Sequence, residues 1–113
     1  MQPVILHATF ALDADAETAV NIDPDYARAY NEVGGLAWKI WIRDPDTKIN
    51  GGLHLFASRG QAEDYLVMLR KRMDGRADVS EFTATIYDVK VAASLETHGP
   101  IDVTGAPAGG QAS

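Results

Sequence analysis

The order of strand-like and helix-like segments is the feature that most constrains this fold. Segments typical of strands occupy residues 4–11, 36–43, 51–57 and 82–89. Amphipathic segments typical of helices follow the first and the third of them. The resulting order, βαββαβ, is that of the split βαβ, ferredoxin-like fold. We therefore expect an α+β domain with a four-stranded antiparallel sheet.

Local signals mark the ends of the two predicted helices. Asp23 and Pro24 suit a helix start, and the helix that follows carries Tyr26 and Tyr30 on one face and stops at Gly34. Short helical turns are also predicted over residues 16–20 and 92–96. A capping box and a C-terminal glycine bound the second helix, whose apolar stripe lies between them: Ser58, Ala62, Tyr65, Leu66, Leu69, Met73 and Gly75.

The strands are expected to pair in a definite way. A turn at 44–46 predicts that the second and third strands form a hairpin, and Gly51 and Gly52 indicate a bulge or a close backbone approach. Right-handed crossovers should place the first and third strands side by side and parallel in the middle of the sheet. The second and fourth strands would then be the edges.

Composition narrows the possible functions. The 113 residues have no cysteine, which excludes a thiol nucleophile and a thiolate zinc site. The net charge of −6 argues against a nucleic-acid partner. No apolar run is long enough to cross a membrane, and the start lacks the pattern of a signal peptide, so a cytoplasmic location is expected. We expect one domain over residues 1–98 and a flexible tail rich in glycine, proline and alanine over 99–113.

The two faces of the predicted sheet differ in chemistry, because side chains alternate along a strand. One set is uniformly apolar and is expected under the helices: Leu6, Ala8, Phe10, Leu36, Trp38, Ile40, Leu53, Leu55, Phe82, Ala84 and Ile86. The other set mixes aromatic, polar and ionisable side chains: Ile5, His7, Thr9, Ala37, Lys39, Trp41, Arg43, His54, Phe56, Thr83, Thr85 and Tyr87. This second face is too apolar to stay bare, which predicts a homodimer closed sheet against sheet around a cavity.

Three linked motifs resemble a known family. The pattern G-x-x-W-K-x-W over residues 35–41 is followed by G-G-x-x-x-F over 51–56 and by Ala62, Tyr65 and Leu66. Together, over residues 4–95, they resemble the YdhR-type monooxygenase family of the dimeric α/β-barrel superfamily. The resemblance implies a ferredoxin-like homodimer and an oxygenase that uses neither metal nor flavin.

Relatives of that superfamily in antibiotic pathways rely on an Asn and a Trp near the pocket. By this resemblance Asn31 is a candidate substrate-binding residue, with Trp38 or Trp41 as the tryptophan. Strand parity assigns Trp38 to the core beneath the helices.

His7 and His54 are the candidate catalytic bases, because histidine exchanges a proton near neutral pH and both share the polar face. The alternative is that each is a half-buried, hydrogen-bonded strand residue. Lys39 is expected to stabilise a substrate anion, with Arg43 as a weaker candidate beside the turn. A metal site is not expected, because a carboxylate ligand on the same face is missing and Asp88 has the other parity.

The remaining candidates would bind substrate. Trp41 and Phe56 would form a flat apolar wall for an aromatic ring, or they would pack a dimer interface. Thr85 and Tyr87 lie on the same predicted face, where Tyr87 is either a cavity hydroxyl or a surface residue. No dinucleotide or phosphate-binding motif is present, so no cofactor is expected.

These inferences predict a cofactor-independent monooxygenase whose partners are a small aromatic or phenolic substrate and molecular oxygen. Two alternatives remain open. One is a homodimer that binds a small molecule without turnover, and the other is a haem-binding enzyme.

Overall fold

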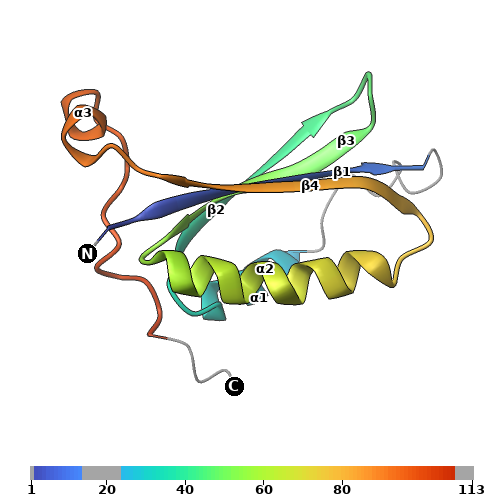
Figure 1. Ribbon diagram of the computed structural model, residues 1–113, viewed down its shortest axis with the longest axis horizontal. Coiled ribbons are helices and arrows are strands. Elements are labelled where there is room, and N and C mark those ends of the chain that lie inside the picture. The colour runs from blue at the N-terminus through green and yellow to red at the C-terminus, as the bar shows by residue number, and fades with distance from the viewer. Residues whose placement is uncertain (1, 14–23, 109–113) are drawn as a thin grey trace.

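The computed structural model describes residues 2–13 and 24–108 (Figure 1). Its elements confirm the predicted α+β class and the βαββαβ order, and the helical turn predicted over residues 92–96 is a short helix after the last strand. The predicted helical turn at 16–20 lies outside the described residues. The elements are β1 (Val4–Leu12), α1 (Pro24–Ala29), the 3₁₀ helix η2 (Tyr30–Glu32), β2 (Leu36–Asp44), β3 (Ile49–Phe56), α2 (Arg59–Asp74), β4 (Val79–Asp88) and α3 (Val91–Glu96).

The sheet has the order β2-β3-β1-β4, with every neighbouring pair antiparallel. The predicted central position of β1 and β3 is confirmed, as are the edges β2 and β4. The prediction that β1 and β3 run parallel was wrong. The crossover through α1 returns the chain so that β2 runs in the same direction as β1. The β2–β3 hairpin then reverses it, and β3 lies antiparallel between them.

The core lies between the sheet and two helices. Figure 1 shows α1 and α2 on one face of the sheet and α3 beyond the other face. Val4, Leu6 and Ala8 of β1 are buried against α2. The predicted stripe on α2 is confirmed, because four of its members are buried and Leu66 packs against them as a partly buried residue: Ala62, Tyr65, Leu69 and Met73.

The start of α2 is capped as the sequence predicts. The Ser58 hydroxyl accepts a hydrogen bond from the Gln61 backbone N–H at 3.3 Å. The same hydroxyl donates to the Gln61 side-chain oxygen at 2.9 Å, so the glutamine bonds the capping side chain. Gly75 is the C-cap, one residue after the helix ends. These local contacts fix the ends of the helix that forms one wall of the site.

The close backbone approach predicted at the two glycines is confirmed at Gly51. A Cβ atom at this position would lie 2.0 Å from the Ala8 carbonyl oxygen on the neighbouring strand β1. Only a residue without a side chain allows the two central strands to approach each other here.

The predicted face of β3 was wrong, and so was that of β2 beyond Leu36, which does lie in the core under the helices. Residues directly opposite each other in a sheet share a face, and His54 lies opposite Leu6 while Phe56 lies opposite Val4. Both therefore lie under the helices, with exposed fractions of 2% and 0%. Leu53 and Leu55 point to the opposite face. The sequence argument assigned the more apolar set to the helices, whereas the helices cover a polar site.

In β2 the face changes because of a register shift between Leu36 and Trp38. Beyond the shift, Lys39, Trp41 and Arg43 lie opposite His54, Gly52 and Asn50, so all three lie under the helices. We call the side of the sheet covered by α1 and α2 the helix face, and the other side the far face. Trp38, Ile40 and Ile42 belong to the far face.

The chain after α3 contacts the body of the domain. The Trp38 indole N–H donates to the Pro100 carbonyl oxygen at 2.8 Å, and the Gly35 backbone N–H donates to that of Pro107 at 2.7 Å. Both acceptors, Pro100 and Pro107, belong to residues 99–108, which are the described part of the predicted tail. In the described part of the chain, no helix has the length and apolar character needed to span a membrane.

Candidate functional site

A cavity of about 410 Å³ opens between the helix face and the two helices that cover it. Its walls come from β1, β2, β3, α1, η2 and α2. Six lining side chains carry the chemistry discussed below: Tyr26, Tyr30, Lys39, Trp41, His54 and Tyr65. A space of this size, lined by aromatic rings and a few polar groups, suits a small organic ligand.

His54 presents an unused hydrogen-bond acceptor in this cavity wall. Its Nδ1 lies 3.1 Å from the Leu6 carbonyl oxygen, so Nδ1 carries the hydrogen and donates it. Nε2 then has a free lone pair, and it is buried without a hydrogen-bond partner among the described residues. Burial, together with the nearby Lys39 ammonium, lowers the His54 pKa to about 4. The ring is therefore neutral at physiological pH.

Lys39 places a cation against two aromatic rings. Its Nζ lies 3.5 Å from the ring centroid of Trp41 and 4.0 Å from that of Tyr30. No described carboxylate lies within ion-pair distance of Nζ. Burial lowers the Lys39 pKa, and the attraction of Tyr30 opposes that effect. Gly52 leaves room for the side chain, because a Cβ there would lie 2.7 Å from Lys39 Cε.

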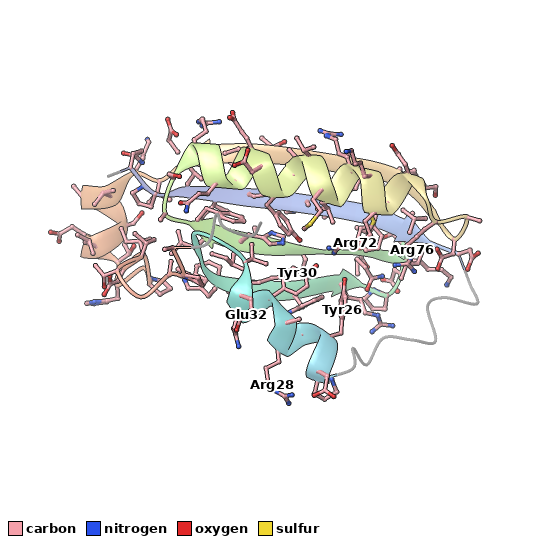
Figure 2. All side chains as sticks on the ribbon, turned by 90° about the horizontal axis from the view of Figure 1, so that it is seen from below. Tyr26, Arg28, Tyr30, Glu32, Arg72 and Arg76 are labelled. Carbon is pink, nitrogen blue, oxygen red and sulfur yellow. The ribbon has the colours of Figure 1, made fainter. Side chains whose placement is uncertain are left out.

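Three tyrosines meet beside this lysine, and we call Tyr26, Tyr30 and Tyr65 the tyrosine cluster. The Tyr65 hydroxyl donates to the Tyr30 hydroxyl at 3.2 Å. Arg72 Nη1 donates to Tyr30 at 3.1 Å and to Tyr26 at 3.3 Å. Figure 2 shows Tyr26, Tyr30 and Arg72 gathered on the inner side of α1 and η2, where the sheet and α2 meet them. Arg28 points away from this cluster.

The cluster shifts the ionisation of its members in opposite directions. Burial alone raises the pKa of Tyr30, but Lys39, the hydrogen bonds of Tyr26 and Tyr65, and Arg72 outweigh it and lower the pKa to about 8. Burial raises the pKa of Tyr65, and the neighbouring Tyr30 raises it further. One phenol in the cavity therefore ionises near physiological pH while its donor stays protonated.

The structure separates the predicted site residues into two groups. His54, Lys39, Trp41 and Arg43 line the cavity. Phe56 belongs to the core beside them, with its ring stacked on His54 at a centroid distance of 6.3 Å.

The other predicted residues lie elsewhere. His7 lies opposite Thr85 on the far face, and Tyr87 shares that face. Asn31 is exposed on η2 and does not line the cavity. The predicted single wall containing both histidines is therefore wrong, because the residue of β1 that shares a face with His54 is Leu6, and His7 points to the opposite face.

Sequence reasoning missed the tyrosine cluster and Arg72 as part of the site. A signal was present, because Tyr26 and Tyr30 are four residues apart and Tyr65 and Arg72 are seven apart, which puts each pair on one helical face. Both pairs fit the simpler interpretations of core packing and helix charge. The structure identifies them as site residues, because the tyrosine hydroxyls and the Arg72 guanidinium meet between η2 and α2.

The arrangement can bind an aromatic ring and stabilise negative charge on it. Trp41 and the tyrosines offer ring contacts, His54 Nε2 accepts a hydrogen bond, and Lys39 supplies a positive charge. Among the described residues, no group of three or more His, Asp or Glu side chains is placed to hold a metal ion.

Comparison with known proteins places the chain in a family. A search of the curated proteins gave no match. A family model described as "Putative mono-oxygenase ydhR" matches residues 5–100, which include the whole sheet except Val4 and all the cavity residues discussed above. Since the match extends over most of the chain, this protein belongs to the ydhR mono-oxygenase family.

Proposed function

We propose that this protein is a monooxygenase that oxidises a small aromatic or phenolic substrate in the cavity on the helix face, without metal, flavin or nicotinamide. The observation that carries the proposal is the unpartnered, buried Nε2 of His54 beside the Lys39 ammonium in an aromatic-lined cavity. An acceptor and a cation in one place match a phenol, whose hydroxyl donates a hydrogen bond and whose oxygen becomes negative on ionisation.

In this proposal the substrate provides all the electrons. His54 Nε2 accepts the hydrogen of the substrate hydroxyl, and Lys39 stabilises the phenolate oxygen that forms. The electron-rich phenolate then reacts with oxygen at a ring carbon. One oxygen atom ends in the carbonyl of a quinone product and the other in water, so the phenol is oxidised and oxygen is reduced. The protein contributes orientation, exclusion of water and charge stabilisation.

His54 is the histidine that this proposal uses, and His7 is not. The cavity position of His54 and its free Nε2 support the choice. His7 lies on the far face, away from α1 and α2 and from the cavity that they cover.

The test is oxygen consumption by the purified, metal-stripped protein with hydroxylated naphthalenes or anthrones. We expect turnover by the native chain, a loss of about 100-fold in His54→Asn, and little change in His7→Asn. His98→Asn is the control, since His98 lies outside the cavity with φ at 64°, a conformation that Asn tolerates. Full activity in His54→Asn would reject the base, and no consumption with any substrate would reject the oxygenase.

The same cavity supports a second function, which is binding a phenol without turnover. Nothing in the acceptor and cation of the site requires a reaction to follow binding. Saturable quenching of tryptophan fluorescence by a naphthol, with no oxygen consumed and the naphthol recovered unchanged, would favour this binding function.

A further inference from the structure

His54 cannot by itself keep the proton that the proposed reaction removes. With its pKa near 4 against about 10 for an ordinary phenol, the proton favours the phenol about a million-fold. The imidazole can therefore accept this proton only transiently, and the proton needs a further acceptor in the same cavity. A candidate acceptor must line the cavity, present an oxygen or nitrogen there, and be stabilised as an anion by its neighbours.

We propose that Tyr30 is a catalytic residue whose hydroxyl oxygen, held as a phenolate by Tyr65, Arg72 and Lys39, receives the proton of the substrate hydroxyl. This inference rests on the proposed function. It adds a residue that neither the motifs nor the strand pattern indicated.

The hydrogen bonds around Tyr30 favour its anion. Tyr65 and Arg72 both donate to the Tyr30 oxygen, at 3.2 and 3.1 Å. The Tyr26 oxygen lies 3.4 Å away and is the group to which a neutral Tyr30 would donate. When Tyr30 ionises, the Tyr26 hydroxyl can turn to donate as well, so three donors then meet at one phenolate oxygen.

The charges around Tyr30, like its hydrogen bonds, favour its anion. The titratable and charged groups that face it are Tyr26 from α1, Lys39 from β2, and Tyr65 and Arg72 from α2. Lys39 and Arg72 are cations, and Arg72 and Tyr65 donate hydrogen bonds to the Tyr30 oxygen. Tyr30 itself is 7% exposed, so these interactions act with little screening by water. Its lowered pKa, near 8, is the result, and it leaves a usable phenolate fraction near neutral pH.

The proton transfer conserves charge within the cavity. The O–H bond of the substrate breaks as its proton moves to His54 Nε2, and that N–H bond then breaks as an O–H bond forms on Tyr30. The net result is that the negative charge moves from the Tyr30 oxygen to the substrate oxygen. Lys39 faces both the Tyr30 ring and the cavity, so its ammonium compensates the charge before and after transfer. Tyr26, which is 44% exposed, links the cluster to solvent and allows Tyr30 to release its proton afterwards.

The first experiment needs no substrate. A titration of the ligand-free protein, followed by the ultraviolet absorbance of tyrosinate, should show one tyrosine ionising near pH 8. This step should vanish in Tyr30→Phe and persist in Tyr87→Phe, a matched control because Tyr87 lies on the far face. It should move to higher pH in Arg72→Gln, which keeps the test available if Tyr30→Phe does not fold. Coincident curves for the native chain and Tyr30→Phe would overturn the proposal.

The second experiment separates this proposal from the proposed function. With a substrate that the native chain oxidises, kcat/KM should rise with pH to a plateau above about pH 8, and Tyr30→Phe should lose about 100-fold along with that pH dependence. Arg72→Gln should move the rise to higher pH. Oxygen consumption that Tyr30→Phe retains, with the same pH profile, would reject Tyr30 and leave the oxygenase intact. No consumption by the native chain would reject the oxygenase itself, whatever the tyrosine titration shows.

Discussion

At the scale of single residues, the chemistry of the cavity depends on two basic side chains, His54 and Lys39, whose pKa values burial lowers. His54 and Lys39 lie directly opposite each other on β3 and β2. Burial is the largest cause of the lowered pKa of each, and Lys39 lowers that of His54 further. The histidine becomes a neutral acceptor next to a lysine that faces aromatic rings. The two roles of the proposed site, acceptor and cation, thus follow from one cross-strand pair.

Replacing Lys39 tests how these two residues interact. In Lys39→Met the ammonium that disfavours imidazolium is gone, so the His54 pKa should rise above about 4. It should stay below the ordinary value of 6.5, because burial, the larger cause, remains. Titration of the histidine resonances by nuclear magnetic resonance measures the change. An unchanged His54 pKa would show that Lys39 does not act on this ring.

The lowered pKa of His54 also predicts how stability depends on pH. Between about 4 and 6.5 the unfolded chain binds a proton at this histidine that the folded chain does not bind. Stability should therefore fall as the pH drops through this window, by up to about 3 kcal/mol from His54 alone. Urea unfolding near neutral pH and near pH 4 measures the loss, which should be smaller in His54→Asn than in the native chain. An equal loss of stability in His54→Asn and in the native chain would contradict this prediction. His98→Asn is the control and should lose as much stability as the native chain does.

At the scale of elements, the sequence correctly predicted the ends and the buried stripe of α2, which local signals determine. It failed to predict which face of the sheet each strand residue occupies, because strand register determines that. The Ser58 cap, the Gly75 end and the buried stripe of α2 need only neighbours within a few turns. The face of Lys39 depends instead on the register shift between Leu36 and Trp38 and on pairing with His54. Choosing faces by hydrophobicity failed because the helices cover a cavity with polar walls.

The two glycines of β3 give a prediction at this scale. A methyl group at Gly51 would meet a backbone oxygen of β1, which cannot move without opening the central strand pair, whereas one at Gly52 would meet the flexible end of Lys39. Gly51→Ala should therefore lower the free energy of unfolding by about 2 kcal/mol or more, and Gly52→Ala by less. Urea unfolding of both variants measures this.

Gly52→Ala should have a second effect that Gly51→Ala lacks. By displacing Lys39 from the rings of Tyr30 and Trp41, it should raise the Tyr30 pKa above about 8 in the tyrosinate titration. Equal destabilisation in the two alanine variants would contradict the different contacts of the two glycines.

At the scale of the whole molecule, the two faces of the sheet are covered unequally. The helix face has α1 and α2 along it, while α3 lies beyond the far face near one end (Figure 1). At that end the Trp38 indole bonds to Pro100, and Leu55 is fully buried. Ile40, further along β2, is 49% exposed, and Tyr87, in the same cross-strand row as Leu55 but on the edge strand β4, is 54% exposed. The uncovered area therefore lies on the side of the sheet opposite the cavity.

This uncovered area predicts a homodimer in which two far faces pack together. Exposed apolar residues on a sheet face are stabilised by a second sheet about 10 Å away, and a second copy of the chain supplies one by symmetry. Analytical ultracentrifugation at micromolar concentration should give the mass of two chains. Ile40→Lys should give the mass of one, with an unchanged circular dichroism spectrum, because it places a charge in the interface.

Val67→Lys is the matched control for the dimer. Val67 is 58% exposed, but it lies on α2, on the other side of the sheet, so this variant should remain a dimer. A native chain with the mass of one protomer would reject the dimer. A dimer that Val67→Lys disrupts and Ile40→Lys leaves intact would place the interface on the helices instead. Because the cavity lies on the helix face, dissociation through Ile40 should leave the Tyr30 ionisation near pH 8 unchanged, which separates assembly from the chemistry of the site.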